Sequence, residues 1–217
     1  MTLCPQTRRL QLAFTLVELL TVIAIIAILM GLLLPAISIM IDRAHKADAS
    51  TSCTGIVNAV RAYQTEYGKY PNALSTTPAT PADVIVGDSS QGGATAGNEH
   101  LFDLLRAIPN GTNANHALNP RKVVFFEGRS AKNPATPKNG FGTGGAFFDP
   151  WGAQYCVALD MDTDNQLTTL PYLDFNGTTK GPRTGVAAYS LGKDGKLGIN
   201  GNLRDSSGSS DDVVTWQ

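Results

Sequence analysis

Cysteine is scarce in this sequence, whose 217 residues contain only Cys4, Cys53 and Cys156. Three scattered thiols are too few for a disulfide-rich scaffold and lack the close, paired spacing of zinc ligands. We expect Cys53 and Cys156 to be buried free thiols that pack as small apolar residues. A disulfide between them in an oxidising compartment is the alternative.

A net excess of charge and catalytic motifs are also missing. The 17 basic and 18 acidic residues leave a formal net charge of −1, so the overall balance indicates no nucleic-acid partner. The three histidines lie far apart, and no G-x-S-x-G, Walker, dinucleotide-binding or H-E-x-x-H pattern occurs. Internal repeats are absent. We therefore expect a non-enzymatic protein with one soluble domain.

What the sequence does contain is a long apolar run near its start. Residues 19–41 carry no charge, and Thr21 and Ser38 are their only clearly polar residues. This length suffices for a helix to cross about 30 Å of hydrocarbon. Arg8 and Arg9 precede the run, which predicts a cytoplasmic N-terminus and an exported C-terminal part. An ordinary signal peptide fits less well, because the run is too long and lacks a small-x-small cleavage site.

Glu18 places a carboxylate at the edge of this apolar run, where it costs a few kcal/mol unless it is paired. If the chain were cut before Phe14, the new α-amino group would lie four residues from Glu18. Glu18 of one subunit could then pair with the amino terminus of the next subunit. The carboxylate would set the register of helices stacked in a membrane.

The stretch AFTLVELLTVIAIIAIL (13–29) closely resembles the prepilin N-terminal motif of type IV pilins and type II secretion pseudopilins. The resemblance implies that a prepilin peptidase cuts between Ala13 and Phe14 and N-methylates Phe14. It assigns Glu18 as the assembly carboxylate and Pro35 as the helix-kinking proline of the family. Ala13 departs from the pattern, which usually has glycine before the cut.

The resemblance and the pattern together predict an α+β, pilin-like fold, in which a long N-terminal helix packs on a small antiparallel sheet. We expect a leader at 1–13, a transmembrane and assembly helix at 14–43, and a periplasmic domain at 44–217 with a loop-rich insertion at 72–145. The first helix should continue to Tyr67, with one apolar face, and end before Gly68 and Pro71. That face consists of Ile56, Val60, Tyr63 and Tyr67.

Shorter elements are predicted within the domain. The spacing of leucines in NEHLFDLLRAI (98–108) predicts an amphipathic helix, and KVVFFE (122–127) predicts a strand. A turn leading into a strand is expected in 147–160, and a strand followed by a glycine-rich loop in 187–198.

The C-terminal loop is rich in hard oxygen donors, which suit calcium. Its acidic residues are Asp194, Asp205, Asp211 and Asp212. A solvated acidic loop without an ion is the alternative.

The order of FDPWG (148–152), YSLGKDGKLG (189–198) and DDVVTW (211–216) resembles major pseudopilins, which hold one structural calcium. The resemblance implies ligands at the Leu191 carbonyl, Asp194 and Asp212. Ser210 stands where the family often has a further aspartate, and Asp211 or Asp205 would have to compensate.

A second acidic stretch, DMDTDNQ (160–166), imitates the start of an EF-hand loop. The loop would need glycine at its sixth position and glutamate at its twelfth, where this chain has Asn165 and Pro171. We therefore expect a polar turn.

These features predict a structural subunit of a type II secretion pseudopilus, anchored in the inner membrane by a single span. Expected partners are copies of itself, minor pseudopilins, the inner-membrane assembly platform, the prepilin peptidase and the membrane. A type IV pilin for adhesion, motility or DNA uptake is one alternative. A membrane-anchored periplasmic domain that never polymerises is the other.

Overall fold

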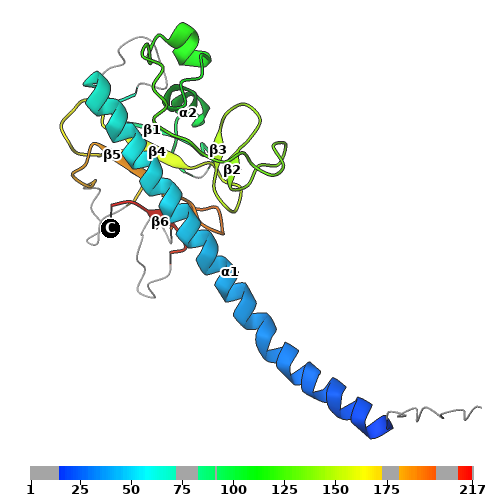
Figure 1. The fold of residues 1–217 in the computed structure, drawn as a ribbon. Coiled ribbons are helices and arrows are strands. Elements are labelled where there is room, and N and C mark those ends of the chain that lie inside the picture. Colours follow the sequence, from blue (N-terminus) through cyan, green and yellow to red (C-terminus); the bar gives the residue numbers. More distant parts are fainter. Residues whose placement is uncertain (1–14, 72–82, 91, 173–180, 199–209, 217) are drawn as a thin grey trace, which may run out of the picture. The chain divides into compact units, whose positions relative to one another are not determined.

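The computed structural model describes residues 15–71, 83–90, 92–172, 181–198 and 210–216 (Figure 1). Contacts within the chain divide it into two units, residues 1–43 and residues 44–217. The helices and strands are α1 (Leu16–Tyr67), β1 (Val84–Val86), α2 (Glu99–Leu105), the 3-10 helix η1 (Gly111–His116), β2 (Gly140–Phe141), β3 (Phe147–Phe148), β4 (Cys156–Leu159), β5 (Val186–Ser190) and β6 (Val213–Val214). The predicted α+β class, with a long N-terminal helix followed by a small antiparallel sheet, is confirmed.

Helix α1 is continuous over 52 residues, as the sequence predicted. Within the unit of residues 44–217, its buried side chains recur at spacings of three and four residues, which places them on one face of the helix. They include Ala49, Cys53, Ile56, Val60 and Tyr63, with Val57 and Ala59 beside them. Gly68 ends the helix: its φ is +69°, and its N–H donates to the carbonyl of Gln64 at 2.7 Å. Glycine adopts this left-handed conformation without the strain of a side chain.

The main sheet has four antiparallel strands in the order β1-β4-β5-β6. Ala158 of β4 lies between Ile85 of β1 and Ala187 of β5, and Tyr189 pairs with Val214 of β6. Strands β2 and β3 form a separate antiparallel pair. Strands β4 and β5 therefore confirm the strands predicted in 147–160 and 187–198.

Both faces of the central strands are covered, so β4 and β5 are buried at every residue. On one face, Val157, Leu159 and Ala188 pack with the buried face of α1 and with α2. On the other face, Ala158, Ala187 and Tyr189 pack with the segment around Leu170 and with Trp216. Figure 1 shows the second half of α1 crossing the sheet. This double cover explains why β4 is apolar throughout rather than alternating.

The helix predicted at 98–108 is confirmed as α2, which is shorter and ends at Leu105. The strand predicted at 122–127 is wrong, because this segment belongs to no ladder. The backbone N–H groups of Phe125 and Phe126 donate to the carbonyl of Leu105 instead, at 2.8 and 3.2 Å. The side-chain oxygen of Asn119 accepts the N–H of Val123 at 3.1 Å. These contacts occupy three backbone N–H groups that a neighbouring strand would otherwise bind.

The loop-rich region predicted at 72–145 lies partly outside the described residues. Its described part contains β1, α2, η1 and β2, and its role as an insertion stays a prediction.

Cys53 and Cys156 are free and fully buried, as the first of the two alternatives predicted. They contribute to different cores: Cys53 packs on the helix side of the sheet, whereas Cys156 packs on the opposite side. Burial raises the pKa of Cys156 to about 12, so its thiol stays protonated near neutral pH.

Candidate functional site

The start of α1 is held by a reciprocal pair of polar residues, Thr15 and Glu18. The Glu18 carboxylate accepts the backbone N–H of Thr15 at 2.9 Å and its hydroxyl at 2.7 Å. The N–H of Glu18 donates in turn to the Thr15 hydroxyl at 3.2 Å. This arrangement is a capping box, in which residues three apart satisfy the free N–H groups at a helix start. Glu18 also lies in the first turn of α1, where a helix favours negative charge.

The capping box was missed from the sequence, although its T-x-x-E signature (15–18) is present. It supplies a local role for Glu18 besides any pairing with a second chain. Both bonds from Thr15 to the Glu18 carboxylate use a single oxygen, Oε2. The other oxygen, Oε1, has no bond to Thr15 in the structure.

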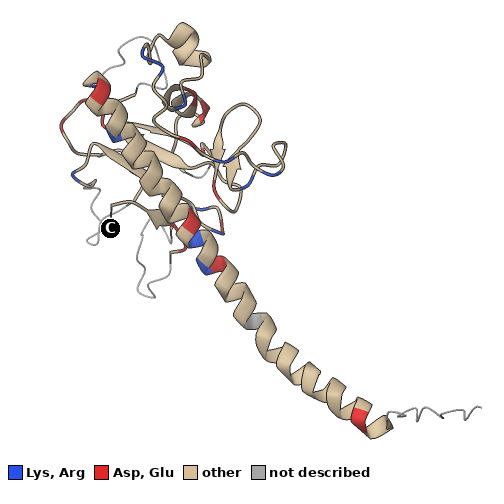
Figure 2. Cartoon of the chain, viewed as in Figure 1, with Lys and Arg blue, Asp and Glu red and all other residues tan. Residues whose placement is uncertain are grey.

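The described side chains of the apolar segment around and after Glu18, residues 16–34 and 36–41, are all exposed. Large side chains such as Leu16, Leu32 and Met40 are between 69% and 78% exposed, which is unusual for a stable surface in water. Helix α1 is the one described helix whose length and composition suffice to cross a membrane. Figure 2 shows this part of α1 almost free of charge, apart from an acidic residue near its start. Pro35 lies within α1, and the kink predicted there stays a prediction.

The C-terminal acidic residues meet at the turn that follows β5. Gly192 begins this turn with a φ of +66°, and a Cβ there would lie 2.5 Å from the carbonyl oxygen of Asp211. Only glycine allows this close approach. The Asp211 carboxylate accepts the backbone N–H groups of Lys193 and Asp194. The turn and the segment before β6 are therefore tied together.

Asp212 holds the other side of the same turn. Its Oδ2 accepts the N–H of Gly198 at 2.7 Å and the hydroxyl of Tyr172 at 3.0 Å. Its Oδ1 is buried and has no hydrogen-bond partner. Burial raises the pKa of Asp212, although the bonds from Gly198 and Tyr172 act in the opposite direction. A buried oxygen of this kind would be stabilised by a bound cation.

The predicted calcium ligands are only partly brought together. Asp194, Asp211 and Asp212 share the turn, while Asp205 lies outside the described residues. The side chain of Leu191 is fully buried in the core. Among the described residues, these carboxylates do not form a cluster of three ligand atoms within 4.8 Å. The donors are nevertheless hard oxygens, and the unpartnered Oδ1 of Asp212 fits a cation that binds oxygen.

Residues 8–34 match the family model of the prokaryotic N-terminal methylation motif. The match supports a type IV pilin-like or pseudopilin subunit. Glu18, its capping box and most of the exposed apolar segment fall within the matched residues. Neither the curated proteins nor the solved structures gave a match to the chain.

The prepilin-type motif points to a structural subunit rather than an enzyme, and it implies processing by a prepilin peptidase and polymerisation in a pilus-like assembly. Its apolar segment fits a membrane-anchored protein. Ala13 and Phe14, which the resemblance assigns to the cleaved bond, lie outside the described residues.

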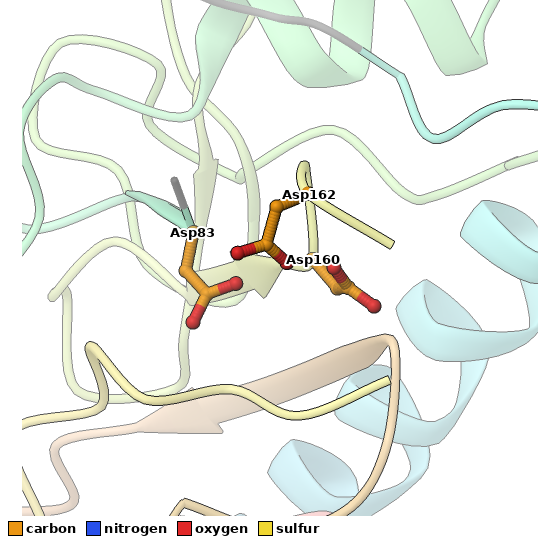
Figure 3. Close-up of side chains that lie close together, drawn as sticks. All are labelled: Asp83, Asp160 and Asp162. Carbon is orange, nitrogen blue, oxygen red and sulfur yellow. The ribbon is translucent and has the colours of Figure 1, made fainter. Parts of the chain in front are cut away.

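Three further carboxylates gather where β4 ends. Figure 3 shows Asp83, the residue before β1, beside Asp160 and Asp162 of the turn after β4. Their oxygens lie within 4.8 Å of one another. Asp160 accepts the N–H of Thr163 at 2.6 Å and that of Asn165 at 2.8 Å, one with each oxygen. Residues 160–166 thus form a polar turn, and the turn accounts for both oxygens of Asp160 without a cation.

A fully buried carboxylate, Asp149, holds the FDPWG segment (148–152). Its Oδ1 accepts three backbone N–H groups, from Trp151, Gly152 and Ala153, at 2.7 to 3.0 Å. Its Oδ2 accepts the hydroxyl of Ser190 on β5 at 2.6 Å. Burial raises the pKa of Asp149, although its hydrogen bonds lower it. One side chain therefore fixes the turn before β4 to the strand that carries the C-terminal loop.

Proposed function

We propose that this chain is a structural subunit of a type II secretion pseudopilus. The observation that carries the proposal is the methylation motif at residues 8–34, which combines Glu18 at a helix start with a long exposed apolar segment. The subunit is cut before Phe14, anchored in the inner membrane and stacked with its copies through α1. The domain of residues 44–217 lies in the periplasm.

Two features favour a pseudopilus over a type IV pilus, which is the nearest alternative. The order of FDPWG, YSLGKDGKLG and DDVVTW is similar to that of major pseudopilins. A disulfide-closed C-terminal loop would favour a pilin, and the described cysteines are free. Minor pseudopilins and an inner-membrane assembly platform are the further partners in this proposal.

Processing gives the first test. In a host with a prepilin peptidase, we expect the intact mass of the membrane-purified chain to correspond to a start at N-methylated Phe14. An Ala13→Gly variant restores the residue usual in the family, so its processed fraction should equal or exceed that of the native chain. A chain that begins near Met1 in both cases would contradict the proposal and favour an anchored domain that never polymerises.

We also propose that the turn of residues 192–198 binds one structural calcium. Asp194 and Asp212 would hold it, with the Leu191 carbonyl and with Asp211 or Asp205 as additional ligands. The ion would neutralise the partly buried carboxylate of Asp212 and stabilise the contact between this turn and β6. Support comes from the oxygen-rich donor set and from the unpartnered Oδ1 of Asp212.

Calcium removal should lower the melting temperature of the full-length chain in detergent. Calcium at 100 times its dissociation constant adds about 2.7 kcal/mol of stability. For a chain of this size, that corresponds to a shift of about 5–10 °C, measured by tryptophan fluorescence with calcium and with EGTA. Asp212→Asn should abolish the shift, while Asp164→Asn, in the other acidic turn, should retain it. Equal melting in calcium and EGTA would overturn the calcium proposal.

A further inference from the structure

The charges of the domain are segregated along the sequence. Residues 121–138 carry five basic residues and one acidic residue, whereas residues 139–179 carry five aspartates and no Lys or Arg. Figure 2 shows basic positions on the loop beside β2. Arg121 lies apart from that loop, where it binds Glu66 of α1. This uneven distribution produces two surfaces of opposite sign on a chain whose net charge is close to zero.

The first surface is a polar depression, here called the basic hollow. It has a volume of about 420 Å³ and is lined by Arg129, Lys132 and Lys138, together with hydroxyl and amide side chains. The guanidinium of Arg129 is held in place by hydrogen bonds to the side chains of Asp48 on α1 and Asn139. Lys132 and Lys138 are exposed, and no described carboxylate lies within ion-pair distance of either. The hollow therefore presents two uncompensated cations.

The second surface is the acidic turn, residues 160–165. Asp162 and Asp164 are exposed there, and Asp83 lies beside Asp162 (Figure 3). Thr163, between the two carboxylates, and Asn165, directly after them, adopt positive φ values of 63° and 60°, so the chain is tightly bent here. No ion pair from this turn to a described Lys or Arg occurs. The turn therefore presents two exposed carboxylates, Asp162 and Asp164.

The two surfaces lie at opposite ends of β4. The basic hollow adjoins the turn before β4, where the N–H of Asn139 donates to the carbonyl of Asp149 at 2.6 Å. The acidic turn begins directly after β4, and the N–H of Asp160 donates to the carbonyl of Gly185 at 3.0 Å. They also lie near different ends of the domain's part of α1. The hollow is tied to Asp48, whereas Gly185 lies against the hydroxyl of Tyr70, just beyond the helix end.

We propose that the basic hollow of one copy receives the acidic turn of the next copy. Opposite charges at opposite ends of one domain make a head-to-tail contact, which forms an open helical filament when it does not close into a ring. The contact would align the domains along the direction of α1, with Lys132 and Lys138 facing Asp162 and Asp164. The inference rests on the proposed polymerising function and identifies the surfaces that join neighbouring domains.

Charge reversal on each surface tests the contact. The full-length chain is assembled in membranes with its processing and assembly machinery, and sedimented filaments are quantified and imaged. Lys132→Glu/Lys138→Glu should reduce filament yield at least about tenfold, because like charges then oppose each other. Asp162→Lys/Asp164→Lys should have the same effect. The chain with all four changes restores opposite charges and should recover most of the yield.

Two further variants separate the contact from folding and from net charge. Asp162→Asn/Asp164→Asn keeps side-chain oxygens that can accept the N–H groups of the turn, and should still weaken assembly. Lys69→Glu/Lys122→Glu changes the net charge as much as the reversal in the hollow, but both residues are exposed and lie outside it. This control should assemble like the native chain.

Cross-linking gives a direct readout of the pairing. Lys138→Cys and Asp164→Cys in one chain should form a ladder of disulfide-linked subunits in filaments, and neither single variant should do so. The native Cys53 and Cys156 are buried and should not compete. The contact is overturned if the native chain forms filaments, the charge-reversed variants assemble equally well, and no ladder appears. The subunit function would still stand in that case. If neither the native chain nor any variant assembles, the subunit function fails and the contact fails with it.

Discussion

Replacing Glu18 by alanine is expected to abolish filament assembly, with the yield of sedimentable filaments falling below detection. The change removes the carboxylate that would pair with the amino terminus of the neighbouring subunit. It also removes one half of the capping box with Thr15. The loss of a cap alone typically costs about 1 kcal/mol, which is too little to abolish assembly of a chain with such a large apolar segment.

Two matched variants distinguish the charge from the cap. Glutamine also serves at this position of a capping box, so Glu18→Gln keeps the cap but loses the charge. Thr15→Ala weakens the cap and keeps the charge. We expect Glu18→Gln to fail in assembly and Thr15→Ala to assemble, with all variants inserted in the membrane at equal levels. Assembly of Glu18→Gln at the native level would show that the charge of Glu18 is dispensable. It would contradict the pairing of this carboxylate with the amino terminus of the next subunit.

Asp149→Ala is expected to lower the free energy of unfolding by about 3 kcal/mol or more, since each buried N–H left without a partner costs about 1–3 kcal/mol. Three backbone N–H groups and the Ser190 hydroxyl would lose their acceptor. Urea unfolding of the full-length chain in detergent, followed by tryptophan fluorescence, measures the loss. Trp151 lies within the affected turn.

Asp149→Asn is the control for this prediction. Its side-chain oxygen can still accept the three N–H groups, and its amide can donate to Ser190, so we expect stability within about 1 kcal/mol of the native chain. The pKa of Asp149 is raised by burial, so its ionised form is disfavoured in the folded state. The contribution of Asp149 to the free energy of unfolding therefore falls as pH rises through the raised pKa. Asp149→Asn should lose this pH dependence. Equal stability of Asp149→Ala and the native chain would contradict the role of Asp149.

The long helix was predictable because its signals are local. The apolar run, the face of Ile56, Val60 and Tyr63, and Gly68 at the end can all be read at fixed spacings. The capping box was equally local, and its T-x-x-E pattern was overlooked. The strand predicted at 122–127 was wrong for a different reason. Its apolar pattern is real, but the carbonyl of Leu105 and the side chain of Asn119 take its N–H groups.

The role of Asp149 could not be predicted from FDPWG alone. The sequence indicates a turn there, but burial of the carboxylate depends on Ser190, which lies 41 residues later. The cluster of Asp83, Asp160 and Asp162 also depends on residues far apart in the sequence. Antiparallel pairing of β1 with β4 brings Asp83 beside Asp160. The calcium ligands remain a prediction, since Asp205 lies outside the described residues.

Strand β6 decides whether the main sheet has an open edge at β5. It has only two residues, Val213 and Val214, yet it is the strand that covers the outer side of β5. The Thr215 hydroxyl reinforces it by bonding both the N–H and the carbonyl of Ala188. Without β6, the apolar strand β5 would become an open sheet edge, the kind of surface that templates aggregation. Segment 210–216 therefore protects the domain against misassembly through this edge.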